Sequence, residues 1–384
     1  LAIPAAASAQ EITARIEGQV VSEDGTPLAN ATVTITDTRT GATRTFQTGP
    51  SGSFSGENLS VGGPYTVTAS ASGYQGQSVE NIVTTLQAAT TLRFDLASSA
   101  DSDVIVVTAQ RANLAIGPGQ AFGENVLNNV PSITNDIRDV IRIDPRVSLD
   151  RNFEVDRVSC LGGNDRSNTF TVDGQVQADV FGLNGTPFAS RSVTPLPYDA
   201  VRETSVEFAP FDVQYGQFTG CAINVVSKSG SNQIHGSGFF TYTSNKLNGD
   251  RLAGTQLTLA PFKEYRWGAT LSGPIIKDKL FLFFGYEETD TGDAQDRGPA
   301  GLGFSNPQNF LTETQYNEVA TILRDVYKAD PGPIAKTLPE SSRRFFGRLD
   351  WLINPDHRLE LTYQRLDATD ISTSGMNATV FTGF

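Results

Sequence analysis

The strongest constraint in this sequence is the alternation of apolar and polar residues from about residue 235 to its end. Within 264–273 the apolar face would carry Tyr265, Trp267, Ala269 and Leu271. The segments 279–287 and 357–364 repeat the pattern, with Leu, Phe or Tyr at alternate positions. A period of two predicts strands with one apolar and one polar face. The runs are close to the ~9–11 residues with which a tilted strand crosses a bilayer.

The connections between these strands are of two kinds. Residues 274–278 and 354–356 are short and contain Pro, Asp and Asn, which favour turns. Residues 245–263 and 289–342 are much longer, and the second is far longer than the loops of a compact soluble domain. Short turns on one side and long loops on the other are typical of transmembrane β-barrels. The pattern favours membrane strands over the alternative, a large soluble β-sandwich.

Composition limits the possible classes of protein. The mean hydropathy is −0.22, and no apolar run approaches the ~18 residues that a membrane helix needs. This excludes a helical span but not strands, because barrel strands carry their apolar residues in alternation. The net charge of −13 argues against nucleic acid as a partner.

The first ten residues, LAIPAAASAQ, resemble the end of a secretory signal peptide. Ala7-Ser8-Ala9 fits an A-x-A cleavage site. Neither an initiator Met nor a basic segment precedes it, so we expect residues 1–10 to be a signal-peptide remnant with the true start missing. A low-complexity linker is the alternative.

Export permits disulfides, and the chain has two cysteines, Cys160 and Cys221. With no third thiol to compete, we expect these two to form one disulfide, with Cα atoms within ~7 Å. They are not expected to bind a metal, because His235 and His357 lie elsewhere in the sequence and four ligands are usual.

Residues 11–97 predict an independent β-sandwich of short Thr- and Val-rich strands separated by turn residues. The expected strands are 15–21, 31–37, 43–48, 65–70, 77–83 and 91–96. The run 18–33, with Phe54, Leu59 and Tyr74, resembles the carboxypeptidase-regulatory-like domain. That domain is similar to carbohydrate-binding, starch-binding-like folds, so sugar binding is an analogy only. Both tryptophans lie in expected barrel strands, so a spacer role is favoured.

Residues 98–112 form a linker with an apolar, β-branched segment. The segment consists of Asp103, Val104, Ile105, Val106, Val107 and Thr108. Two interpretations are open: an ordinary buried strand, or an exposed strand that pairs with another protein by β-augmentation. It resembles the TonB box of outer-membrane active transporters, although Ala109 follows it where Gly is commoner. The resemblance implies capture by periplasmic TonB, and the segment is expected to be unpaired or loosely paired at rest.

Residues 113–232 carry a further series of recognisable segments. A helix is predicted over 135–142, and the pieces TVDG (171–174) and INVVSKSGSN (223–232) follow in order. This order resembles the plug of TonB-dependent receptors of the Oar-like type, and the resemblance extends over about residues 15–370. It implies a plug region at 113–232, containing the disulfide, and a barrel region at 233–384.

A plug must fill the polar lumen of a wide barrel. The inward faces of the expected strands carry Arg266, Arg348, Asp350, Arg358 and Glu360. These residues either hold the plug through polar, partly wet contacts or only line a solvated lumen. About five strands are visible, whereas the family implies 22, so we expect an N-terminal fragment. In the long loop, Thr312 and Gln315 predict a capping box that opens a helix.

The expected fold is mainly β, and no catalytic constellation or cofactor motif is present. The resemblance implies an outer-membrane receptor that takes up a large or scarce substrate, such as a siderophore, an oligosaccharide or a peptide-like compound. Its expected partners are TonB, outer-membrane lipid and an unidentified extracellular substrate, with the sandwich and box in the periplasm. The alternatives are an adhesion or structural protein of the outer membrane, and a carbohydrate-binding module.

Overall fold

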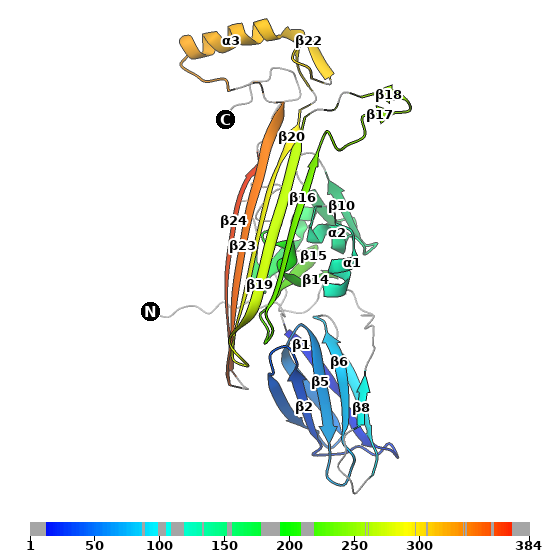
Figure 1. Cartoon of the computed structure of the whole chain (residues 1–384). Helices are drawn as coiled ribbons and strands as arrows, with labels where there is room; N and C mark the ends of the chain where they lie inside the picture. The colour runs from blue at the N-terminus through cyan, green and yellow to red at the C-terminus, as the bar shows by residue number, and fades with distance from the viewer. Residues whose placement is uncertain are drawn as a thin grey trace. The chain divides into compact units, whose positions relative to one another are not determined.

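The computed structural model describes residues 13–86, 89–98, 105–108, 119–132, 134–151, 156–177, 193–208, 219–257, 259, 261–295, 297–304, 306–332, 334, 336–354 and 357–370. The chain is mainly β, as the sequence predicts (Figure 1). It divides into two compact units: residues 1–237, 270–285 and 345–364, and residues 238–269, 286–344 and 365–384. Within the described residues, no helix is both long and apolar enough to span a membrane.

The N-terminal part is a sandwich of two sheets. One sheet has the order β4-β1-β7, from β1 (Thr13–Ser22), β4 (Ser53–Ser60) and β7 (Thr90–Leu96). The other has the order β3-β2-β5-β6-β8, from β2 (Thr32–Asp37), β3 (Thr43–Gln47), β5 (Gly62–Ser70), β6 (Gln77–Thr84) and β8 (Ile105–Thr108). The two sheets enclose an apolar core that includes Ile16, Val33, Val67 and Phe94. Strand β4, which contains three Ser and the segment Gly-Glu-Asn, is not among the strands expected from the sequence.

The plug region contains a second five-stranded sheet. Its order is β13-β12-β15-β14-β9, from β9 (Gly119–Gly123), β12 (Thr169–Val172), β13 (Gln175–Val176), β14 (Val201–Phe208) and β15 (Cys221–Ser227). A hairpin of β10 (Val147–Arg151) and β11 (Asp156–Cys160) accompanies it, with the short helices α1 (Glu124–Asn129) and α2 (Ile137–Ile141). Helix α2 confirms the predicted helix but is shorter, because Asp136 caps it by accepting from Arg138 N at 2.8 Å.

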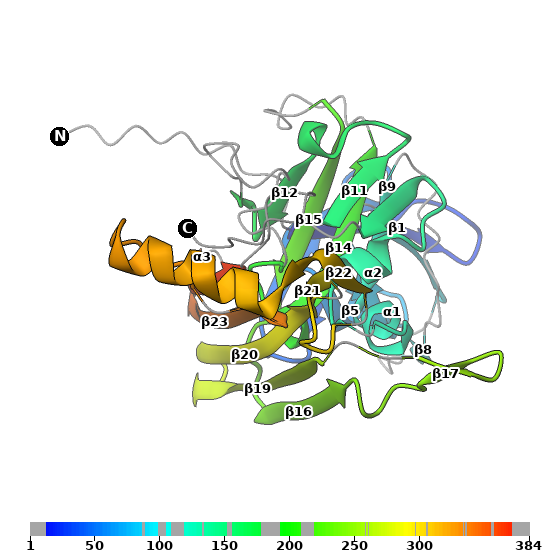
Figure 2. The same cartoon turned by 90° about the horizontal axis from the view of Figure 1, so that it is seen from above.

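The alternating segments form a third five-stranded sheet, of order β16-β19-β20-β23-β24 (Figure 2). Its strands are β16 (His235–Ser244), β19 (Lys263–Ile276), β20 (Leu280–Ala294), β23 (Thr337–Asn354) and β24 (His357–Asp370). The five strands of this sheet therefore lie side by side in the order in which they occur in the sequence. The last four strands have 14, 15, 18 and 14 residues, which is longer than the ten or so predicted.

The short turn between β19 and β20 contains fewer residues than predicted. Residues 277–279 form it, whereas Pro274 lies within β19. Asp278 adopts a φ of 61°, a left-handed conformation that Asp tolerates better than most residues. The predicted turn at 354–356 falls mostly on residues 355 and 356, which lie outside the described residues.

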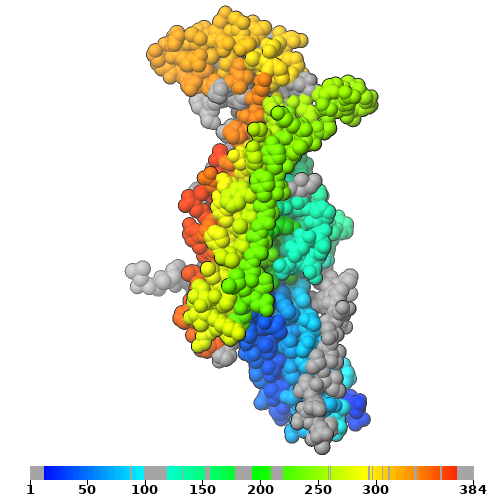
Figure 3. Space-filling view, viewed as in Figure 1, coloured from blue at the N-terminus to red at the C-terminus, as the bar shows by residue number. Residues whose placement is uncertain are grey.

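The predicted outward face of β19 is confirmed. Tyr265, Trp267, Ala269 and Leu271 are exposed, while Arg266 and Gly268 between them are buried. Aromatic rings pair along the outward side, with centroids 5.1 Å apart for Tyr242–Tyr265 and 5.1 Å for Trp267–Tyr286. Such ring contacts between neighbouring strands stabilise a sheet, and outward-facing aromatic residues are typical of barrel surfaces. Side chains of β16 and β19 cover this surface (green to yellow in Figure 3).

The two long connections carry structure of their own. Residues 295–336 contain β21 (Arg297–Ala300), β22 (Asn306–Thr312) and α3 (Glu313–Asp325). The predicted capping box is confirmed: Gln315 N donates to Thr312 Oγ1 at 3.3 Å, and Thr312 N donates to Gln315 Oε1 at 2.9 Å. The connection after β16 contains the small hairpin of β17 (Arg251–Leu252) and β18 (Thr255–Gln256).

Candidate functional site

Arg348 is the centre of a buried ion cluster on the inward face of β23. Its Nη2 lies 2.8 Å from Asp350 Oδ1 and 3.1 Å from Glu360 Oε2 on β24. Its Nη1 donates to Ser227 Oγ at 3.0 Å and lies 3.7 Å from Asp173 Oδ1. A planar guanidinium can bond several carboxylates at once, and Arg348 uses that capacity here.

Asp173 and Ser227 belong to the plug region, so the cluster joins that region to two barrel strands. The two residues also bond to each other: Ser227 Oγ donates to Asp173 Oδ2 at 2.7 Å, and Ser227 N donates to Asp173 Oδ1 at 2.9 Å. Asp173 follows β12 with a φ of 47°, in the TVDG segment, and Ser227 ends β15. The sequence pattern singles out both segments but assigns neither residue a role.

The other predicted lumen residues divide into two groups. Asp350 and Glu360 hold the guanidinium of Arg348, as described above. Arg266 is buried, but its described ion pair is with Glu264 on its own strand, at 3.4 Å. Arg358 pairs with Glu360 and donates to Ser60 Oγ of the sandwich. Among the five, Arg348 is therefore the residue that the described contacts place against the plug region.

Two further polar contacts join the plug region to barrel strands. Ser237 Oγ on β16 donates to Asp199 Oδ2 at 2.9 Å, and Gln364 Nε2 on β24 donates to Gln177 Oε1 at 3.2 Å. With Arg348 on β23, they place polar contacts on three of the five strands.

The expected polar, partly wet contacts are accompanied by an apolar contact that was not expected. Phe283 on β20 and Phe346 on β23 are buried in the same apolar cluster as Val201 and Ile223 of the plug region. The two phenylalanine rings lie 6.2 Å apart between centroids. A folded domain, unlike water, offers an apolar surface, so the inward strand faces can carry large apolar residues where they meet it.

The predicted box segment is only partly within the described residues. Asp103 and Val104 lie outside them, whereas Ile105–Thr108 forms β8. This strand pairs in parallel with β6, with Ile105 opposite Gln77 and Thr108 opposite Glu80. Of the two states expected at rest, unpaired and loosely paired, the unpaired one is wrong for these four residues, because they pair with the edge that β6 offers.

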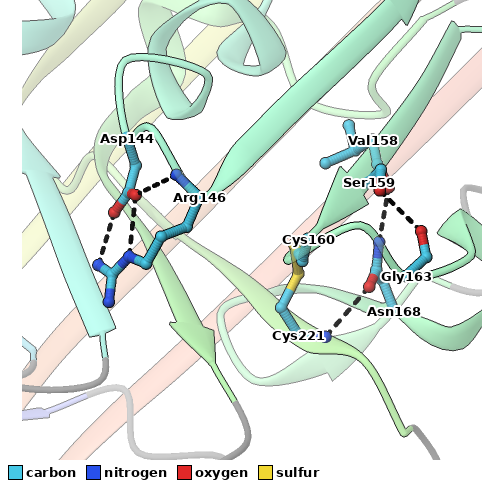
Figure 4. Close-up of a disulfide and its surroundings, with 8 residues drawn as sticks. All are labelled: Asp144, Arg146, Val158, Ser159, Cys160, Gly163, Asn168 and Cys221. Carbon is cyan, nitrogen blue, oxygen red and sulfur yellow. Dashed lines mark hydrogen bonds and ion pairs between the residues drawn. A yellow bond between two sulfur atoms is a disulfide. The ribbon is translucent and has the colours of Figure 1, made fainter.

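The structure contains the predicted disulfide between Cys160 and Cys221, with Cα atoms 6.1 Å apart (Figure 4). It joins the end of β11 to the start of β15. Asn168 reinforces the connection, because its Oδ1 accepts from Cys221 N at 3.0 Å and its Nδ2 donates to Val158 O at 2.8 Å. The β10–β11 hairpin is thus attached to the sheet both covalently and by hydrogen bonds.

A buried carboxylate lies on β14, where no sequence motif predicts one. Glu203 is 2% exposed and accepts a hydrogen bond from Leu86 N at 2.9 Å. Burial penalises the ionised carboxylate and raises the pKa of Glu203 to about 7, although the Leu86 hydrogen bond and the charge of neighbouring Arg202 act the other way. A protonated Glu is therefore favoured in the folded state over the unfolded state between about pH 4.5 and pH 7.

We expect Glu203→Gln to stabilise the plug region at pH 8 and to leave it unchanged at pH 4. In wild type, the unfolded state loses this proton at lower pH than the folded state, so stability falls as pH rises from about 4.5 to about 7. The loss should be on the order of 3 kcal/mol. Gln cannot ionise but can still accept from Leu86 N. Urea unfolding of the plug region, monitored by limited proteolysis at pH 4 and pH 8, measures this loss of stability. An equal loss of stability between the two pH values in the Gln variant would contradict the prediction.

Two families match the sequence. Residues 15–97 match the carboxypeptidase regulatory-like domain, and residues 226–331 match an outer membrane beta barrel domain. The TonB-dependent transporter Oar of Myxococcus xanthus is 31% identical over 229 residues, which are 57% of this chain and 20% of the relative. The chain thus spans about a fifth of that relative's length.

Solved outer-membrane receptors align with part of the chain. The siderophore receptor PirA from Pseudomonas aeruginosa is 16% identical, with a TM-score of 0.40, over 67% of this chain and 36% of that chain. The outer membrane transporter YddB from Escherichia coli is 13% identical, with a TM-score of 0.45, over 65% and 33%. By sequence, the chain is similar to the TonB-dependent transporter Oar, and it matches a carboxypeptidase regulatory-like domain and an outer membrane beta barrel domain.

Proposed function

We propose that this chain is part of a receptor that takes up a large or scarce substrate across the outer membrane, using energy delivered by periplasmic TonB. The single observation that supports this most is the attachment of the plug region to the inward face of barrel strands through Arg348, Asp173 and Ser227. A domain held by non-covalent contacts, both polar and apolar, can block a wide pore and still be moved. An adhesion protein has no need for such a movable part.

The order of parts along the chain supports the coupling to TonB. The residues 103–108 precede the plug region directly, so a pull on them would act on the plug region rather than on the barrel. Their β-branched side chains favour an extended conformation, which suits strand addition. We place the sandwich and this segment in the periplasm. The substrate is proposed as a class only: a siderophore, an oligosaccharide or a peptide-like compound.

A binding titration tests this function. The full-length receptor in detergent micelles is titrated with the purified periplasmic domain of TonB, with a peptide spanning residues 101–110 as competitor. We expect saturable binding that the peptide displaces and that a peptide of the same composition in scrambled order does not. Absence of binding would favour the adhesion or structural role.

The proposed topology predicts where a protease can cut. The exposed Arg324 and Lys328, beyond β22 in the long connection, should face the outside, and the exposed Lys277 and Lys279 should face the periplasm. Of these two pairs, trypsin added to intact cells that express the full-length receptor should cut at the first and not at the second. Cells with a permeabilised outer membrane should allow cleavage at the second pair as well. Cleavage of intact cells at Lys277 or Lys279 alone would reverse the topology.

A further inference from the structure

The pairing of β8 with β6 places the box segment at the edge of the sandwich. The ladder has four register pairs, from Ile105–Gln77 to Thr108–Glu80, and both strands run in the same direction. In the sheet order β3-β2-β5-β6-β8, the box strand is the outermost strand among the described residues (β8 beside β6 in Figure 1). One edge of β8 thus pairs with β6, and its other edge is the rim of the sheet.

The chain connection makes this pairing local. Ser98, at the end of the sandwich, forms an antiparallel bridge with Tyr74, three residues before β6 begins at Gln77. Ile105 then pairs with Gln77 itself. Ser98 and Ile105 therefore both lie near the start of β6, and the six residues that separate them in sequence give β8 a high effective concentration at this edge.

Strand β6 has an irregularity just beyond its last described pair with β8. Asn81 adopts a φ of 59°, and the register between β5 and β6 shifts between the pairs Tyr65–Ile82 and Val67–Val79. This irregularity follows Glu80, which is the last residue of β6 to pair with β8 among the described residues.

We propose that the sandwich presents the box to TonB as a preformed edge strand, and that TonB adds to the outer edge of β8. This inference rests on the proposed function. Binding would extend the sheet to β3-β2-β5-β6-β8-TonB, with β6 kept in place. An extended segment that is already ordered loses less conformational entropy on binding, and an outer strand edge offers unpaired N–H and C=O groups. The short connection between Ser98 and Ile105 also resists displacement of β6 from the inner edge of β8. No described strand occupies the outer edge of β8.

If the sandwich presents the box to TonB, hydrogen exchange in β6 should stay slow when TonB binds. If TonB displaces β6 from the box, hydrogen exchange in β6 should accelerate. The full-length receptor in detergent micelles is measured with and without the periplasmic domain of TonB. We expect the amides of Gln77–Thr84 to remain protected in the complex, while additional amides within Ile105–Thr108 become protected. Loss of protection in β6 on TonB binding would mean that TonB displaces the sandwich from the box, and it would overturn the inference.

Two proline variants provide a matched second test. Consecutive N–H groups of a strand point to opposite edges, so in Val106→Pro and Val107→Pro one variant removes a donor facing β6 and the other removes a donor on the outer edge. If both edges are used, each variant should weaken TonB binding at least about tenfold. If TonB needs one edge only, one variant would bind like wild type, and the presentation of the box would be refuted.

The two proposals fail in different ways. If TonB does not bind the wild-type receptor, the proposed function fails and the inference fails with it. If TonB binds wild type but exchange in β6 accelerates, or one proline variant binds normally, the proposed function stands and only the presentation of the box is overturned.

Discussion

A receptor with Arg348→Leu is expected to hold its plug region about 3–5 kcal/mol less tightly than wild type. Removing the guanidinium leaves Asp350, Glu360 and Asp173 close together, and the cation that they share is lost. Asp350 is buried, so water cannot solvate its charge fully. Ser227 loses its hydrogen bond from Arg348 as well. The urea concentration at which the plug region becomes sensitive to protease measures the loss.

Arg343→Leu is the matched control on the same strand. Arg343 pairs with Glu288 at 3.0 Å, but its side chain is 67% exposed. Water screens the charges of an exposed ion pair, so this control should resemble wild type. Outer-membrane permeability to large polar solutes should rise in the Arg348 variant only. Equal behaviour of the two variants would show that Arg348 only lines the lumen.

Removal of the disulfide is expected to destabilise the plug region by about 4 kcal/mol, through the larger conformational entropy of the unfolded chain. The bond closes a loop with a sequence separation of 61 residues. The change is Cys160→Ala together with Cys221→Ala, which removes both cysteines of residues 1–384. Urea unfolding of the plug region measures the difference.

Wild-type receptor treated with reductant is the control for this double variant. Both samples lack the covalent bond, so both should unfold at the same lower urea concentration. If the double variant unfolds like untreated wild type, the hydrogen bonds of Asn168 suffice to hold β11 against β15.

The barrel strands could be predicted because alternation is a local property of the chain. Each residue of β19 faces outward or inward by its position in the strand, and Tyr265, Trp267 and Leu271 follow that rule. The helix α3 was predictable for a similar reason, since its capping box needs only Thr312 and Gln315, three residues apart. Strand β4 was not predicted, because its Gly-Glu-Asn segment (56–58) has low strand propensity and Phe54 and Leu59 become core residues only through the other sheet.

The partners of the candidate site residues depend on contacts between distant segments. Arg348 is recognisable as an inward residue, but Ser227 lies 121 residues away and nothing local links the two. The inward Phe283 and Phe346 break the expected polar face, because they meet a folded domain rather than water. The pairing of β8 with β6 depends in the same way on an edge that exists only once the sandwich has folded.

The positions of the two tryptophans have a spectroscopic consequence. Trp267 and Trp351 are the only tryptophans of this chain, and both project from the outward face of barrel strands, 42% and 44% exposed. Their fluorescence should therefore be quenched by brominated lipid when these strands enter a bilayer. Unfolding of the sandwich or the plug region would leave their emission nearly unchanged, because neither part contains tryptophan. In this chain, intrinsic fluorescence follows insertion of the barrel strands rather than movement of the plug region.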